Sequence, residues 1–212
     1  MSNFSHVKDL RPMTSNSPRT YTLDAEKLKL NAYRLLCLFY ANTEIARTSD
    51  PEEPTDAATS LERQFFAREM TELLLSIAIG IRVLDDQMLS LEPTNDLRVS
   101  YLAKKEQVNK ARHCMMFDEM PLREVCNKII HAVVVEPHST EGTGSHQIDN
   151  YNWQGYSEAK DQSPDEEWAE PEPVKWNHLS GNIRLGGSRK KEQWWLLLMV
   201  PEFVEAVYGL VN

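Results

Sequence analysis

The sequence predicts a mainly α protein, a helical bundle that carries a small inserted antiparallel β-hairpin or sheet. In two long segments apolar residues recur at steps of three and four, the period of a helix with one buried face. Residues 174–200 instead form two strand-like stretches on either side of a Gly-Gly pair, which is typical of a hairpin. The chain has 212 residues, of which 41% are hydrophobic, enough to bury a core without disulfides. We therefore expect one domain over residues 22–212.

The first two helices follow from the apolar pattern. Residues 1–21 contain two prolines and no periodicity, which predicts a flexible tail. A helix is expected over residues 24–47, capped by Thr22 or Asp24, and the linker 49–56 ends it with two prolines. The second helix has the longest stripe, about six turns, and ends near Pro93. Its apolar positions are Phe66, Met70, Leu73, Ile77, Ile81, Leu84 and Met88.

Two further helices are expected after Pro93. Residues 97–116 are rich in helix formers, and their basic residues outnumber a single acid, so we predict a helix with a basic face. Pro121 fits the first turn of the next helix, because proline lacks the N–H that would be unpaired there. On that helix Arg123, Asn127 and His131 lie four residues apart and form one polar stripe.

The last third of the sequence predicts extended structure around an insertion. The run of three valines ending at Val135 favours a strand, which Pro137 is expected to close. Residues 141–173 hold glycines and then acids and prolines, which predicts a mobile acidic insertion. Its four aromatic residues indicate that part of it docks on the domain or on a protein partner: Tyr151, Trp153, Tyr156 and Trp168. A hairpin over 174–200, turning at Gly186 and Gly187 with a basic tip, then leads to a last helix from residue 201.

Charge and cysteine content narrow the classes of function. The chain has 23 Lys and Arg against 32 Asp and Glu, a formal net charge of -9, which disfavours non-specific nucleic-acid binding by the whole molecule. Ten acids lie in residues 50–56 and 161–172, so leaving them aside turns -9 into +1 for the rest. Three cysteines, no visible signal peptide and no apolar run near the roughly 20 residues of a membrane span predict a cytoplasmic protein without a membrane partner.

Metal and phosphate motifs do not emerge from the sequence. The 6 histidines show no ligand spacing, so neither a metal nor another cofactor is expected. Asp85 and Asp86 are adjacent on a helix and point about 100° apart, which does not favour one shared cation. The glycines between Gly181 and Gly187 lack the following Lys-Ser/Thr and helix of a phosphate-binding loop.

The helix over residues 122–132 carries the best candidate site. Its string Asn127-Lys-Ile-Ile-His131, followed by a small residue, resembles the second half of the motif of the HEPN superfamily. Active members carry an Arg, often followed by a polar residue, and a His four to six residues later. The order of two long helices, a motif helix and a short final helix is also similar. Cys126 occupies the place before Asn127 where the family usually has Arg, and Arg123 lies one turn earlier.

The resemblance implies a metal-independent endoribonuclease, often dimeric and part of a toxin–antitoxin, abortive-infection or stress system. The catalytic residues would then be Arg123, Asn127 and His131. His131 would transfer protons, Arg123 would donate to a phosphate and Asn127 would orient either one. Nearby cations would bind the RNA: Lys104, Lys105, Lys110, Arg112 and Lys128.

Two other functions and a structural interpretation stay open at this point. Inactive HEPN-like members serve as binding modules, and an acidic immunity or antitoxin protein would mask a basic toxin. In the structural interpretation Arg123 pairs with Glu119 or with an acid of the second helix. Asn127 and His131 would then form hydrogen bonds across the bundle. An open cleft would favour catalysis, whereas buried and satisfied side chains would favour the structural role.

Overall fold

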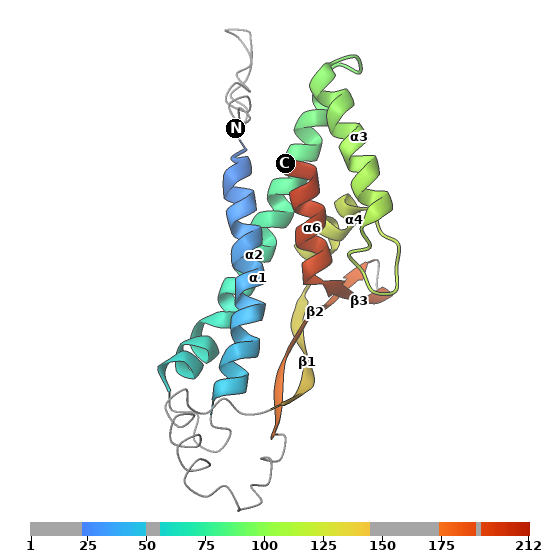
Figure 1. Ribbon diagram of the computed structural model, residues 1–212. Coiled ribbons are helices and arrows are strands. Elements are labelled where there is room, and N and C mark those ends of the chain that lie inside the picture. Colours follow the sequence, from blue (N-terminus) through green and yellow to red (C-terminus); the bar gives the residue numbers. More distant parts are fainter. Residues whose placement is uncertain (1–22, 50–55, 145–173, 190–191) are drawn as a thin grey trace, which may run out of the picture.

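The computed structural model describes residues 23–49, 56–144, 174–189 and 192–212 (Figure 1). This part of the chain forms five helices and one three-stranded antiparallel sheet, as the sequence predicts. The predicted tail and most of the predicted acidic insertion lie outside the described residues. The elements are α1 (Ala25–Thr48), α2 (Ala57–Ser90), α3 (Asp96–Ala111), α4 (Leu122–Ile130), β1 (Val134–Gly144), β2 (Val174–Arg189), β3 (Glu192–Met199) and α6 (Val200–Val211).

The two long helices run antiparallel and start at aspartate caps (Figure 1). Asp24 accepts a hydrogen bond from the backbone N–H of Lys27 at 3.1 Å, and Asp56 accepts one from Thr59 at 2.9 Å. α2 begins well before the predicted apolar stripe and ends at Ser90, before Pro93, as predicted. None of the described helices is long and apolar enough to cross a membrane.

The core lies between α1, α2, α4, α6 and one face of the sheet. α1 packs against α2, α6 and β2, α4 packs on α2, and α3 packs mainly on α6. α1 and α2 approach closely at Gly80, where an added Cβ would lie 2.4 Å from a Leu28 methyl carbon. The largest fully buried side chains come from α1, α2, α4, α6, the sheet and the segment after α3: Leu35, Met70, Leu74, Ile77, Ile81, Met115, Val125, Ile183, Leu185, Leu198, Val200 and Phe203.

The predicted helix over residues 97–116 is too long at its C-terminal end. α3 stops at Ala111, and the chain then pairs with the outer edge of β3. The Met116 N–H donates to the carbonyl of Leu197 at 3.0 Å, and Met115 is buried beside Leu198. Burial against the sheet and strand-type hydrogen bonds outweigh the modest helix propensity of this segment.

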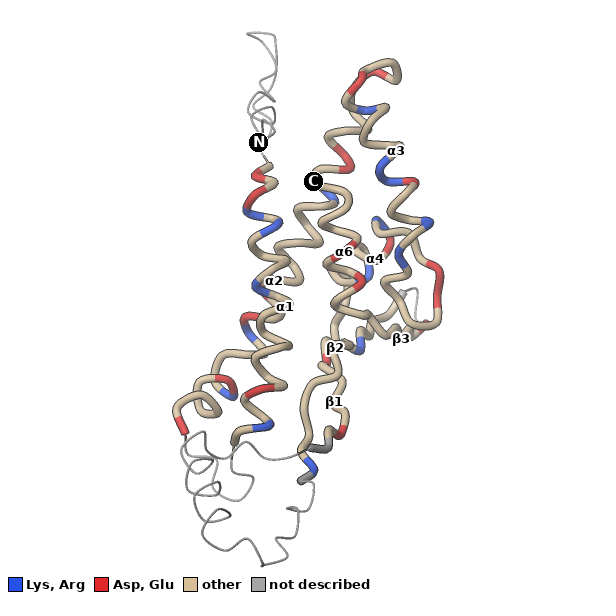
Figure 2. Tube along the Cα trace, in the orientation of Figure 1, with Lys and Arg blue, Asp and Glu red and all other residues tan. Residues whose placement is uncertain are grey.

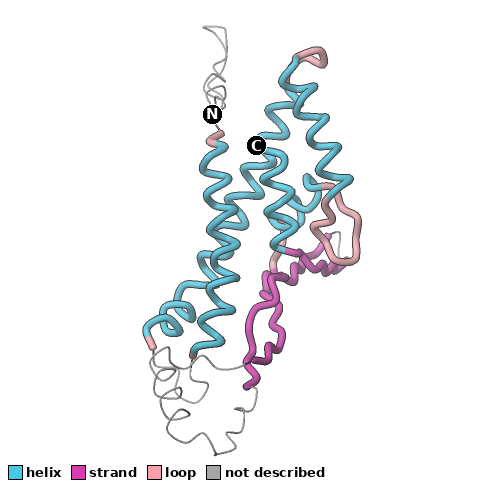
Figure 3. The backbone as a smooth tube through the Cα atoms, in the orientation of Figure 1, coloured by secondary structure: helices cyan, strands magenta, loops and turns pink. Residues whose placement is uncertain are grey.

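The first strand extends further than predicted, because Pro137 does not close it. β1 continues to Gly144 and shifts its register between Pro137 and Ser139. The strand order is β1-β2-β3, so β1 is an edge strand, where a proline without an N–H is tolerated. Figure 3 shows the strands gathered beside the lower part of the helices.

The predicted turn at Gly186 and Gly187 is wrong, since both glycines lie inside β2. Gly186 is paired with Trp195 and Gly187 with Trp194 of β3. A Cβ on either glycine would lie 2.4 Å from a carbon of the facing indole ring. Because the glycines lack a Cβ, they leave room for the two tryptophan rings. β2 continues beyond them to Arg189.

Candidate functional site

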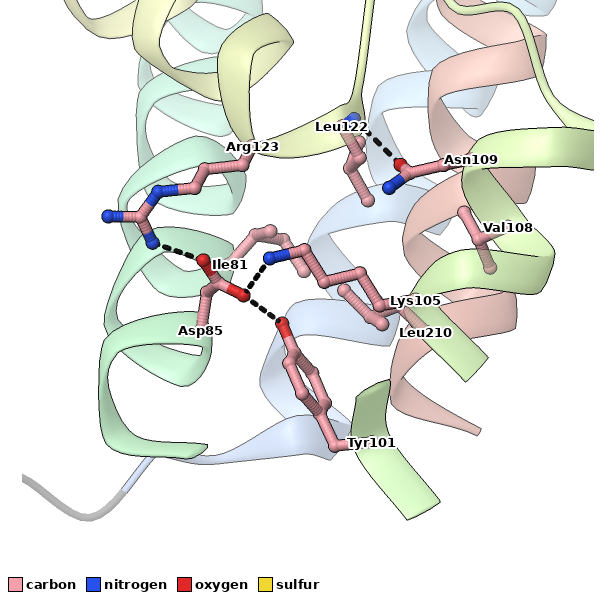
Figure 4. A pocket seen from close by; sticks show the side chains of 9 residues that line it. All are labelled: Ile81, Asp85, Tyr101, Lys105, Val108, Asn109, Leu122, Arg123 and Leu210. Atoms are coloured by element: carbon pink, nitrogen blue, oxygen red, sulfur yellow. Dashed lines mark hydrogen bonds and ion pairs between the residues drawn. The ribbon is translucent and has the colours of Figure 1, made fainter. Parts of the chain in front are cut away.

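Arg123 lies in the first turn of α4 and points toward α2, where Asp85 collects three donors (Figure 4). Asp85 is 1% exposed and accepts hydrogen bonds from Tyr101 at 2.9 Å and Lys105 at 2.5 Å. A nitrogen of the Arg123 guanidinium donates to the other carboxylate oxygen of Asp85. The second terminal nitrogen of Arg123 lies 2.8 Å from Asp86. This cluster joins α2, α3 and α4.

The Asp85 cluster is ionised and nearly closed. Burial acts to raise the pKa of Asp85, but hydrogen bonds from Lys105, Arg123 and Tyr101 outweigh it and hold the pKa below its usual value. Desolvation and the neighbouring Asp85 carboxylate raise the pKa of Tyr101, which therefore remains a neutral donor. The hollow between these side chains has a volume of about 10 Å³, room for about one water molecule. The cluster is an interhelical ion pair without space for a substrate.

The three residues of the predicted catalytic stripe do not converge. Arg123 pairs with acids of the second helix, as the structural interpretation predicts. Asn127 donates to Glu124 of its own helix at 3.1 Å instead of reaching across the bundle. His131 is the C-cap residue of α4, and its exposed imidazole has no hydrogen-bond partner among the described residues. Eight residues of helix place His131 about 12 Å along the axis from Arg123.

Position 126, where the HEPN motif has Arg, faces the core. The Cys126 side chain is fully buried between α4 and α2, and burial raises the pKa of its thiol. An arginine in this place would be buried in the core rather than directed at a ligand in solvent. The cysteine at this position, where the HEPN motif has Arg, therefore fits a buried place in the core.

Four of the five predicted RNA-binding cations already have acceptors on or beside α3. Lys105 binds Asp85, and Lys110 lies 2.7 Å from Glu106. Lys104 donates to the Asn212 carbonyl oxygen at 2.6 Å. Arg112 also has acceptors, because two acids of α6 lie 3.3 and 3.4 Å from its guanidinium. Acids therefore neutralise Lys105, Lys110 and Arg112 of the predicted basic face.

The fifth cation, Lys128, lies beside the β2–β3 hairpin. Its ammonium is 4.3 Å from the centre of the Trp194 ring. The guanidinium of Arg184 lies 5.0 Å from the Trp195 ring, and Trp195 is 52% exposed. We call Lys128, Arg184, Trp194 and Trp195 the hairpin-tip surface. The sequence alone does not single out these two tryptophans, because the pair Gly186 and Gly187 predicts a turn.

The hairpin tip is a thin two-stranded ribbon with one tryptophan on each side. Beyond Gly186 the residues of β2 pair only with β3, because β1 begins opposite Gly186. Successive strand residues point to opposite faces, so Trp194 faces α4 and Trp195 faces outward. Arg184 also binds Glu136 through two of its nitrogens, which fixes the guanidinium beside the outer tryptophan.

No protein-family model matches the chain, and neither a curated protein nor a solved structure matches it. The resemblance to the HEPN superfamily therefore depends on the motif helix and the order of the helices alone. Among the described residues, no group of three or more His, Cys, Asp or Glu side chains is arranged to hold a metal ion.

Proposed function

We propose that the chain is a non-catalytic HEPN-like module that binds single-stranded RNA on the hairpin-tip surface. The observation that carries the proposal is the half-exposed Trp195 ring beside Arg184 on the outer side of the hairpin. Trp194, on the opposite side, is partly buried against the core beside Lys128. Indole rings stack on unpaired bases of any sequence, and cations beside them attract the phosphates. His131 lies at the C-terminal end of α4, one turn beyond Lys128.

We infer the absence of catalysis because Arg123, Asn127 and His131 do not converge on one site. Cleavage beside a ribose 2′-hydroxyl needs a base and a cation at the same phosphate. Arg123 is held by Asp85 and Asp86, and the only histidine of the stripe lies at the other end of α4. Arg123 and His131 of one chain therefore do not meet at one phosphate.

An endoribonuclease remains the second candidate because of one observation. The His131 imidazole is exposed and lacks a hydrogen-bond partner among the described residues, so it is accessible to a substrate. In this alternative a second protomer supplies the cation that Arg123 does not. The motif helix and the helix order resemble those of the often dimeric HEPN ribonucleases, and this favours such an arrangement.

The RNA-binding proposal is tested with a short fluorescein-labelled uridine oligomer and the full-length chain. We expect Trp195→Ala to raise the dissociation constant measured by fluorescence anisotropy about tenfold, since one base–aromatic stack contributes about 1–3 kcal/mol. Trp195→Phe retains a stacking face and should lose less affinity. Tyr208→Ala is the matched control, because Tyr208 is an equally exposed aromatic residue toward the far end of α6.

The same samples separate binding from cleavage. The labelled RNA should remain intact on a denaturing gel after incubation with the wild type or with His131→Ala. Cleavage by the wild type but not by His131→Ala would replace the proposal with the endoribonuclease alternative. No detectable binding, or equal binding by Trp195→Ala and Tyr208→Ala, would reject the hairpin-tip surface as an RNA site.

A further inference from the structure

α1 has two apolar faces, of which the described chain covers only one. Its inner face packs Leu28 and Leu35 against the core. On the opposite side the aromatic residues Tyr33 and Tyr40 are 65% and 66% exposed. Together with Leu30 and Cys37 they follow steps of three and four, which we call the α1 outer stripe (Leu30, Tyr33, Cys37, Tyr40). In Figure 1 the upper part of α1 lies at the edge of the bundle, with α6 on its other side and α2 crossing it.

Charged pairs flank the outer stripe symmetrically. Near the start of α1, Glu26 and Lys29 form an ion pair of 3.0 Å, and near its end Glu44 pairs with Arg47. The midpoint of this segment falls between residues 36 and 37. Glu26 and Arg47 are equally far from this midpoint, and so are Lys29 and Glu44.

We infer that the α1 outer stripe binds a second copy of this chain, with the two α1 helices antiparallel about a two-fold axis near Cys37. In this register Tyr33 faces Tyr40 of the second copy, because the two tyrosines are also equally far from the midpoint. The contact occurs twice, as a two-fold interface requires.

The charges select the antiparallel orientation. Glu26 then faces Arg47 of the second copy, and Lys29 faces Glu44, so each end of the interface has opposite charges in contact. A parallel pair would place each charge against its own kind, which is unfavourable. The stripe is complementary to itself, and this identifies a second copy as the occupant. The inference is independent of RNA binding, since α1 contributes nothing to the hairpin-tip surface.

Sedimentation velocity of the full-length chain tests the interface. We expect a concentration-dependent dimer whose dissociation constant rises at least tenfold in the double variant Tyr33→Ala/Tyr40→Ala. Both side chains are mostly exposed, so the fold should tolerate their loss. Tyr208→Ala removes an exposed tyrosine from α6 and should leave the dimer unchanged.

A charge exchange tests the register separately. Lys29→Glu should weaken the dimer, because it places two acids against each other across the interface. Adding Glu44→Lys should restore the dimer, because the exchanged charges are again opposite between the copies. Within one helix the double variant places like charges together at both ends, so a role confined to the monomer predicts no recovery.

A short bismaleimide provides a third measurement, because Cys37 lies near the proposed axis. Cys114 and Cys126 are buried, and burial raises the pKa of the Cys114 thiol to about 12, so Cys37 should be the reactive thiol. We expect a cross-linked dimer that disappears with Cys37→Ser. A monomer at all concentrations, no recovery by the charge exchange, or cross-linking that persists in Cys37→Ser would overturn the inference.

Discussion

At the scale of single residues, the contacts of Asp85 explain why Arg123 of the predicted catalytic stripe has a structural role. Its buried carboxylate accepts from three different side chains on two neighbouring helices. A charge in this position is stable only while its partners remain, because desolvation is offset by those hydrogen bonds. Arg123 therefore belongs to the framework that fixes α4 on α2.

Removal of the Asp85 carboxylate should destabilise the fold strongly. Asp85→Ala leaves Lys105 and Arg123 partly buried without their shared acceptor, and the loss of one partner of a buried pair costs about 3–5 kcal/mol. The free energy of unfolding is measured by urea titration followed by circular dichroism. Asp86→Ala is the matched control, since Asp86 is the next residue but is 58% exposed, and we expect a change of about 1 kcal/mol or less. Equal losses in both variants would contradict the assignment.

The contribution of Asp85 should also depend on pH in a defined direction. Its pKa is lowered in the folded state, so the unfolded chain binds the proton more readily. The stabilisation is complete above the unfolded pKa of about 3.9 and is lost as the pH falls through the lower folded value. The difference in unfolding free energy between wild type and Asp85→Asn, measured from neutral pH downward, should shrink only below about pH 4. A difference that does not change with acidification would contradict this prediction.

At the scale of elements, the hairpin is held together by a fit between glycines and rings. Gly187→Ala would place a Cβ 2.4 Å from the Trp194 indole, so we expect a loss of about 1–3 kcal/mol in the free energy of unfolding. In a Trp194→Ala background the same substitution should cost much less, which a double-mutant cycle measures. Ser188→Ala, in the same strand but exposed, should have little effect. Independent, additive effects of Gly187→Ala and Trp194→Ala would show that the ring does not require the glycine.

The same hairpin explains where prediction from sequence fails. The apolar period predicts α1 and α2 because each helix buries one face, and period alone determines that face. A Gly-Gly pair, in contrast, is compatible with a turn and with a close contact in a strand. Only the cross-strand register distinguishes them, and register depends on contacts between residues distant in the sequence. Pro137 misleads for the same reason, since its tolerance depends on β1 being an edge strand.

The candidate site was predictable only in part. Four-residue spacing correctly places Arg123, Asn127 and His131 along one short helix segment. Which of them faces an acid, and which faces solvent, depends on the packing of α4 against α2. The two tryptophans lie opposite the two glycines, a pattern visible in the sequence once the two segments are assumed to pair directly.

At the scale of the whole molecule, the acidic composition restricts how RNA binds. The formal net charge is -9, and Figure 2 shows acids and bases interspersed along the helices. A diffuse positive field is therefore missing from the described surface, and binding must depend on a few local cations with stacking beside them. The two candidate RNA surfaces differ in the number of cations, five in the set predicted from sequence and two in the hairpin tip.

The salt dependence of RNA binding should distinguish these two surfaces. Each phosphate neutralised on a single strand contributes about 0.7 to the slope of log affinity against log salt concentration. Lys128 and Arg184, of which Arg184 is shared with Glu136, predict a slope no steeper than about -1.4, whereas five cations predict about -3.5. Anisotropy titrations between about 50 and 200 mM salt measure the slope. Lys128→Ala should make it less steep by about 0.7, and Lys104→Ala, the control on α3, should leave it unchanged. A slope near the larger value, or a change with Lys104→Ala, would place the RNA on α3 instead of the hairpin tip.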